Sequence, residues 1–99
     1  MVDINTYQPS LGELCHTLSV KRLELVGSAA REDFHPESSD IDVLIEFEGD
    51  NALFDRYFEL KFGLEKIFGR NVDVIQRDAI KNPHLRASLD QDRIAVYEA

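Results

Sequence analysis

The sequence predicts an α/β (α+β) protein, a single mixed β-sheet with helices packed on it. Three short segments, 22–26, 40–47 and 71–76, alternate apolar and polar residues as half-buried strands do. Between the second and third, residues 52–68 place apolar side chains at helical spacing. A helix of that length is the connection that two parallel strands need, whereas a short return between the first two strands makes them antiparallel.

The remaining elements of the first half follow from local signals. A first helix is expected over 10–21, because Ser10 and Glu13 have the spacing of a capping box. Gly27 is expected to end the first strand. A short turn or helix at 28–31 and a polar loop at 32–39, interrupted by a proline, then lead to the second strand.

The second half carries its own start and stop signals. Asp50 or Asn51 is expected to cap the long helix, which Gly69 ends as a C-terminal glycine does. Asn82 followed by proline is typical of the start of a last helix, running to about residue 89. Residues 93–97 are expected to close the sheet as an edge strand.

Size and composition indicate one cytoplasmic domain spanning residues 1–99. No apolar run approaches the roughly 20 residues that cross a bilayer, and the first residues show no secretory signal. The single cysteine, Cys15, lies in an apolar helical pattern, so we expect a packed and inert thiol. A lone cysteine also fits a reducing compartment.

The formal net charge of −8 bears on the choice of partners. A surface of that sign repels phosphates, and no run of Lys or Arg offsets it, so long DNA or RNA is not expected as a substrate. A basic protein partner is electrostatically easier. Part of the excess acid is expected in a metal site, where a cation would cancel it.

Three carboxylates are expected at one edge of the sheet. Asp40 and Asp42 lie two residues apart on a strand, so their side chains point to the same face. Asp73 lies near the start of the next strand, and the long helical crossover brings it to the same end of the sheet. Like charges at this range repel, and a divalent cation with oxygen ligands, Mg²⁺ where phosphates complete the shell, removes the conflict. Asp40, Asp42 and Asp73 are therefore the candidate catalytic and metal-binding residues.

Gly27 and Ser28 form a candidate phosphate-binding turn beside these carboxylates. Glycine lets the backbone approach a phosphate closely, and the N–H groups that follow attract anions. Together the residues indicate attack of an acceptor hydroxyl on the α-phosphate of a nucleoside triphosphate, with pyrophosphate leaving. Two Mg²⁺ ions, about 3.5–4 Å apart in such sites, are expected, and Asp73 is placed to help deprotonate the hydroxyl.

These residues resemble the signature of the DNA polymerase β nucleotidyltransferase superfamily. The pattern is Gly27-Ser28 followed by 39–47, which contains the Asp-x-Asp pair. Residues 72–75 resemble the strand with the family's third carboxylate, and 83–98 resemble its usual C-terminal segment. The short chain is similar to the minimal nucleotidyltransferase branch.

The resemblance implies a polymerase β-like palm fold and an ATP-using, magnesium-dependent enzyme. Proteins of this branch often pair with a small helical HEPN protein as the antitoxin of a toxin–antitoxin system, and can silence the toxin by adding AMP to a tyrosine. The resemblance therefore implies an adenylyltransferase that acts on a HEPN-type partner, with Asp40, Asp42 and Asp73 as its catalytic set.

One turn departs from the family pattern. The family's turn often reads Gly-Ser-Arg-Ala-Arg-Gly, whereas residues 27–32 read Gly-Ser-Ala-Ala-Arg-Glu. The first arginine and the last glycine are absent, which bears on nucleotide affinity more than on the carboxylates. Arg31 remains a candidate nucleotide-binding residue beside Gly27 and Ser28.

Two other functions stay open at this level. The first is a non-catalytic module of the same fold that binds nucleotide or a partner, and the complete carboxylate set argues against it. The second is a small-molecule nucleotidyltransferase, a class that usually carries an extra acceptor-binding domain for which 99 residues leave no room.

The helix expected at 52–68 carries more aromatic residues than one core-facing stripe needs. Most are expected in the core, with Tyr57 or Phe62 at a partner or homodimer surface. The three histidines, His16, His35 and His84, lack metal-ligand spacing. We expect His16 and His84 on the surface, and His35 lies in the loop that faces the candidate site.

Overall fold

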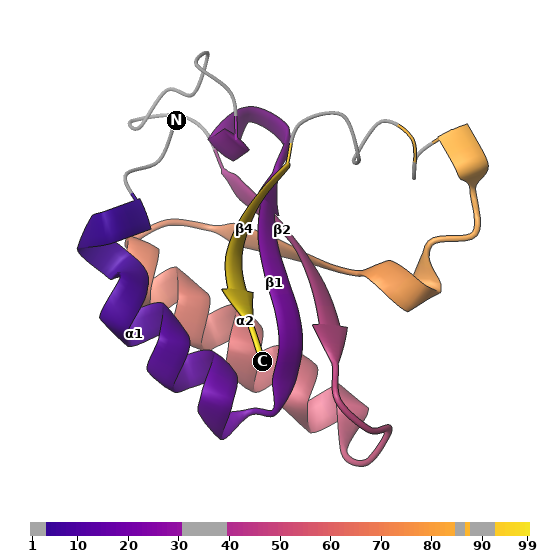
Figure 1. Cartoon of the computed structure of the whole chain (residues 1–99), viewed down its shortest axis with the longest axis horizontal. Helices are drawn as coiled ribbons and strands as arrows, with labels where there is room; N and C mark the ends of the chain where they lie inside the picture. Colours follow the sequence, from indigo (N-terminus) through magenta and orange to yellow (C-terminus); the bar gives the residue numbers. More distant parts are fainter. Residues whose placement is uncertain (1–3, 31–39, 85–86, 88–92) are drawn as a thin grey trace.

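The computed structural model describes residues 4–30, 40–84, 87 and 93–99 (Figure 1). Along the chain its elements are α1 (Ile4–Thr17), β1 (Val20–Val26), the 3-10 helix η1 (Gly27–Ala30), β2 (Ile41–Phe47), α2 (Leu53–Phe68), β3 (Val72–Gln76), the 3-10 helix η2 (Arg77–Ala79) and β4 (Arg93–Glu98). The expected mixed sheet with packed helices is therefore confirmed.

The four strands form one sheet in the order β3-β2-β1-β4. β1 pairs antiparallel with β2 and β4, whereas β2 and β3 are parallel. These are the pairings that the short return and the α2 crossover predicted, and β4 lies at the edge as expected. The topology brings the end of β1 and the starts of β2, β3 and β4 to the same end of the sheet.

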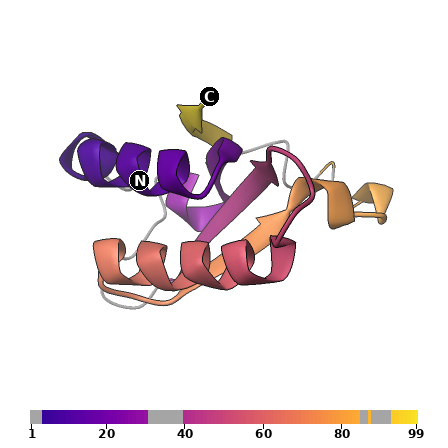
Figure 2. The ribbon, with the colours of Figure 1, turned by 90° about the horizontal axis from the view of Figure 1, so that it is seen from below.

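Both helices cover one face of the sheet. Alternate residues of β2, Ile41, Val43 and Ile45, are buried in one cluster with side chains of both helices. That cluster includes Leu11, Cys15 and Leu18 of α1 and Leu60, Leu64 and Phe68 of α2. Figure 2 shows α1 and α2 running next to each other with the strands slanting across them. The opposite side of the sheet, on which Asp42 and its alternating neighbours lie, is called the far face below.

The first helix begins six residues earlier than the capping pattern predicted, at Ile4 rather than Ser10. Tertiary contacts outside the local pattern hold this extra stretch. The Tyr7 ring meets that of Phe68 edge-on at 4.9 Å between centroids, and Gln8 Nε2 donates to the Val96 carbonyl oxygen at 2.9 Å. The helix also ends at Thr17, not Lys21, so that the backbone can turn into β1 through left-handed Ser19.

The sequence predicted the C-terminal end of α2 correctly but not its N-terminal cap. The expected cap at Asp50 or Asn51 is wrong, because the residue before the helix is left-handed Ala52, with no side-chain cap hydrogen bond. Gly69 ends the helix as predicted, with φ 69° and its N–H donating to the Glu65 carbonyl oxygen. Left-handed backbone at that position favours glycine.

The structure also tests the predictions made for Cys15, the histidines and the last helix. Cys15 is buried, and His16 and His84 are exposed. The N–H of His84 donates to Asn82 Oδ1 at 2.9 Å, as an N-cap does. The rest of the last helix expected over 82–89 lies largely outside the described residues, as do the loop at 32–39 and His35. No helix in the described part of the chain is long and apolar enough to cross a membrane.

Candidate functional site

Two of the three candidate carboxylates meet side by side on the far face. The register of β2 with β3 pairs Asp42 directly with Asp73, and their side chains share a hydrogen bond. Asp40 lies exposed immediately before β2, and its charge also acts on Asp42. The sheet register therefore places Asp42 beside Asp73, and Asp40, which was expected on the same strand, lies just before it.

This crowding changes the protonation of Asp42. Partial burial raises the pKa of its carboxyl group, the charge and the hydrogen bond of Asp73 raise it further, and the charge of Asp40 adds a smaller part in the same direction. A carboxyl whose neighbours oppose its ionisation is a group that a cation would stabilise. A raised pKa is expected where acidic side chains are brought together to bind a cation or to transfer a proton.

Gly27 lies directly against Asp42. Val26, the last residue of β1, pairs with Asp42, and Gly27 follows it in left-handed backbone with φ 63°. A Cβ atom at Gly27 would stand 2.9 Å from Asp42 Oδ2, closer than real contacts allow. Glycine is therefore needed here for its backbone conformation and for its lack of a side chain.

The other nucleotide-binding candidates are less defined. Ser28 belongs to η1, and its side chain lies outside the description; Arg31 lies outside the described residues. The backbone of η1 follows Gly27 at the same end of the sheet as Asp42 and Asp73.

The donor chemistry of these residues fits a magnesium ion. All candidate ligands are carboxylate oxygens, which hard divalent cations prefer, and the Asp42–Asp73 hydrogen bond marks a charge conflict that a cation would remove. Within the described ranges, however, no group of three or more His, Cys, Asp or Glu side chains is placed to hold a metal ion together. The structure thus joins Asp42 to Asp73 and leaves Asp40 beside them.

A second group of charges on the far face escaped the sequence analysis. Glu24 of β1 is only 5% exposed, and it lies between two arginines, with Oε2 3.6 Å from Arg93 Nε and Oε1 3.9 Å from Arg77 Nη1. Arg77 also approaches Glu46 at 3.8 Å. The only sequence signal was an acidic residue inside the apolar stretch Leu23-Glu24-Leu25. In the sheet register Arg93 pairs with Val26, the residue before Gly27, so the backbone position of this cationic residue lies beside the glycine turn.

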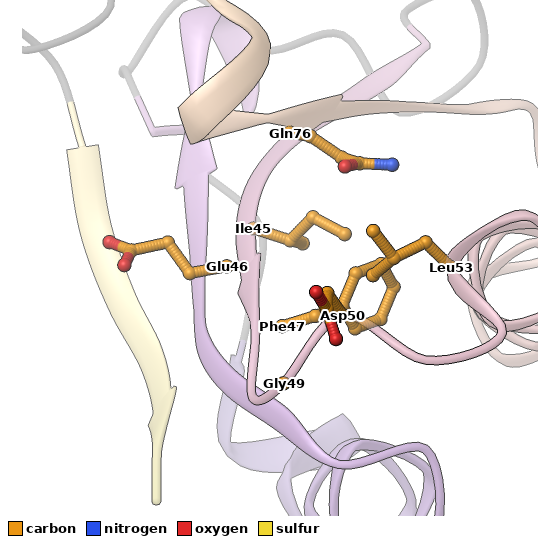
Figure 3. A pocket seen from close by; sticks show the side chains of 7 residues that line it. All are labelled: Ile45, Glu46, Phe47, Gly49, Asp50, Leu53 and Gln76. Carbon is orange, nitrogen blue, oxygen red and sulfur yellow. The ribbon is translucent and has the colours of Figure 1, made fainter.

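One small cavity lies at the other end of β2 and β3. It measures about 160 Å³ and is lined by Ile45, Glu46, Phe47, Gly49, Asp50, Leu53 and Gln76 (Figure 3). Figure 3 shows the side chain of Glu46 projecting to the other side of its strand from Ile45. The cavity is smaller than the roughly 300–1,000 Å³ of ordinary ligand pockets and is remote in register from Asp42 and Asp73. It is therefore not the candidate site.

The fold and the site define a class of protein: a palm-like sheet with paired carboxylates beside a glycine turn. Residues 10–96 match the nucleotidyltransferase domain family. Two relatives from Methanocaldococcus jannaschii are named "Putative protein adenylyltransferase" MJ1379 and MJ0128. The first is 44% identical over 78 residues, covering 78% of this chain and 77% of that protein. The second is 39% identical over 77 residues, covering 78% and 76%. The chain belongs to the nucleotidyltransferase family, and its enzymatic class is nucleotidyltransferase.

Solved structures agree on the fold. A structure described as a "putative minimal nucleotidyltransferase" superposes with a TM-score of 0.75 at 29% identity, covering 94% of this chain and 95% of that one. A chain from a complex of the tri-AMPylated Shewanella oneidensis HEPN toxin with its MNT antitoxin gives 0.67 at 15% identity, covering 98% and 74%. The second likeness is one of fold alone.

Proposed function

We propose that this chain is a magnesium-dependent adenylyltransferase that transfers AMP from ATP to a hydroxyl group of a HEPN-type protein partner. The observation that carries the proposal is the pairing of Asp42 with Asp73 against the Gly27 turn. The adenylyltransferase names of relatives up to 44% identical support the reaction class. The partner class rests on the HEPN–MNT complex that shares the fold.

In the proposed reaction the acceptor oxygen attacks the α-phosphorus of ATP. A new P–O bond forms, the bond from the α-phosphorus to the bridging oxygen of the β-phosphate breaks, and pyrophosphate leaves. Asp73, which is exposed and hydrogen-bonded to Asp42, takes the proton of the acceptor hydroxyl. The N–H groups after Gly27 hold the triphosphate in line with the attacking oxygen.

Asp40, Asp42 and Asp73 would hold the magnesium, with two ions expected. Bound magnesium offsets the negative charge that develops on the phosphate oxygens. Binding also removes the conflict that raises the pKa of Asp42, because a cation favours the ionised form. Arg31 is the remaining proposed nucleotide contact.

The test uses ATP labelled at the α-phosphate, a purified HEPN-type protein as acceptor, and Asp42→Asn beside the wild type. We expect label on the acceptor with the wild type and Mg²⁺, and none with Asp42→Asn or with EDTA. ATP labelled at the γ-phosphate is the control, because AMP transfer leaves no γ-label on the product. Equal labelling by Asp42→Asn would exclude these carboxylates from the mechanism.

The non-catalytic alternative makes a different prediction. If the chain neutralised its partner by contact alone, Asp42→Asn would neutralise the partner as well as the wild type does. An assay of partner activity with both proteins therefore separates the two functions.

A further inference from the structure

A ridge of exposed phenylalanines runs along the outer side of α2. Phe54, Phe58 and Phe62 are 75%, 36% and 60% exposed, and they are the large apolar side chains that remain exposed in the described part of the chain. Neighbouring rings touch, with centroids 4.9 Å and 5.9 Å apart. Figure 2 shows α2 along an outer edge of the molecule. We call these three residues the phenylalanine ridge.

The spacing of the ridge suits packing against another protein. Residues four apart form the ridges that insert into grooves between helices, and anchors spaced in this way are typical of a helix that docks in an apolar groove. At about 200 Å² for each phenylalanine, the exposed fractions leave roughly 340 Å² of ring surface in water. That is comparable with the largest patch of a typical monomer, about 300–600 Å², which is often functional.

Folding within this chain does not explain the ridge. The core side of α2 is supplied by Leu60, Leu64 and Phe68, all buried. Of the two residues expected as alternatives at a surface, Phe62 is exposed, whereas Tyr57 is half-buried, with its hydroxyl donating to the Val74 carbonyl oxygen at 3.1 Å. Replacing Phe54 or Phe62 would therefore leave the core intact, whereas Phe58 also meets the Tyr57 ring edge-on at 5.1 Å between centroids.

The charges beside the ridge select the kind of partner. Asp55 and Glu59 are exposed, and each follows a ridge phenylalanine by one residue, so both lie on the same flank of the helix, where the exposed Lys66 follows only beyond the ridge, about two turns after Glu59. A two-fold pairing of α2 with a second copy, centred on Phe58, would bring these carboxylates beside those of the other copy. The net charge of −8 adds to that repulsion. A partner with basic residues along its groove meets no such cost.

The ridge is separate from the candidate active site. It lies on the helix layer, whereas Asp42 and Asp73 lie on the far face of the sheet. A protein held at the ridge therefore leaves these carboxylates accessible.

We propose that the phenylalanine ridge of α2 docks in an apolar groove of a helical partner protein, with Lys or Arg residues of that groove facing Asp55 and Glu59. The class of partner rests on the proposed function. The surface itself rests on exposure, spacing and charge.

The test measures binding of a purified HEPN-type protein, the class of partner proposed above, by calorimetry. We expect Phe54→Ser, Phe58→Ser and Phe62→Ser together to weaken binding at least about 30-fold, as loss of a central apolar anchor does. Asp55→Lys with Glu59→Lys should weaken binding and reduce its salt dependence. The control is Glu13→Lys, an exposed carboxylate of α1, which should bind within twofold of the wild type. Every variant should still unfold in one cooperative thermal transition, which shows that the fold is retained.

The outcomes separate this inference from the proposed function. Asp42→Asn should bind normally. If the wild type transfers AMP to the partner and the phenylalanine variant binds it equally well, the ridge inference is refuted and the function stands. If the variant loses binding but the wild type transfers no AMP, the function is refuted and the ridge stands. No binding by the wild type, or a wild-type dimer in sedimentation that Phe58→Ser converts to monomers, would also overturn the ridge inference.

Discussion

Arg56 ties α2 to the turn before β1 and the turn after β2, and replacing it with alanine is expected to be among the most destabilising single changes in α2. Its side chain is buried, at 8% exposure, and its guanidinium lies 4.4 Å from the centre of the Phe47 ring. Nε donates to the Leu18 carbonyl oxygen at 2.9 Å, and Nη1 donates to that of Asn51 at 3.0 Å. Nη2 donates at 2.8 Å to the carbonyl oxygens of Ser19 and Glu48.

The size of the effect follows from these contacts. A hydrogen bond to a charged group contributes about 1.5–3 kcal/mol, and a buried acceptor left without a donor costs about 1–3 kcal/mol. Only the bond to Leu18 is fully buried, and the other three carbonyls can regain water in part. We therefore expect Arg56→Ala to lower the free energy of unfolding by about 3–4 kcal/mol, well below the sum of four bonds. At about 4–8 °C per kcal/mol, Tm should fall by roughly 12–30 °C.

Thermal and urea unfolding followed by circular dichroism would measure this change. Arg56→Lys should lose about half as much, because an ammonium group keeps the charge but not the planar fork of donors. The control is Lys66→Ala, an exposed residue of the same helix, which should change the free energy of unfolding by less than about 0.5 kcal/mol. A loss below about 1 kcal/mol for Arg56→Ala would refute the reasoning, since it would mean that water replaces the guanidinium at little cost.

Three further predictions concern the site and the core. Burial and the Asp73 and Asp40 charges raise the pKa of Asp42, so the folded state holds its proton more tightly than the unfolded state does. In metal-free buffer, stability from this group is present at low pH and is lost as pH rises through the raised pKa. Asp42→Asn should then exceed the wild type in Tm at pH 7 and match it near pH 3; equal Tm values at pH 7 would contradict this. Gly27→Ala should lower the free energy of unfolding by about 2 kcal/mol, because of its φ of 63° and the Asp42 contact. The control Gly12→Ala, with open space around it, should be neutral or stabilising in unfolding measurements. Burial raises the pKa of the Cys15 thiol to about 12, so iodoacetamide at pH 8 should modify it only after unfolding; native-state labelling, seen by mass spectrometry, would show that the thiol is accessible.

Local patterns were enough for most of the fold. The alternation within 40–47 predicted β2, and helical spacing up to Gly69 predicted the extent of α2. They failed at α1, where the capping pattern at Ser10 proved internal to the helix. The contacts of Tyr7 and Gln8 that extend α1 involve Phe68 and Val96, far away in the sequence, and no local signal reports them.

In the candidate site, too, local sequence predicted some features and missed others. The face on which Asp42 lies could be assigned from the sequence, because the period of a strand is fixed by its backbone, whereas Asp40 lies just before the strand on which it was expected. The left-handed Gly27 was also expected as a turn. The burial of Glu24 between Arg77 and Arg93 was not, since its neighbours come from η2 and β4.

The sequence by itself determined the kinds of element, their order, and the face of β2 on which Asp42 lies. These depend on backbone geometry over a few residues. Only the tertiary structure decided that Asp73 stands opposite Asp42, that Arg56 ties α2 to two turns, and that the phenylalanine ridge remains exposed. Strand register and burial depend on the packing of residues far apart along the chain, and a local pattern does not contain that information.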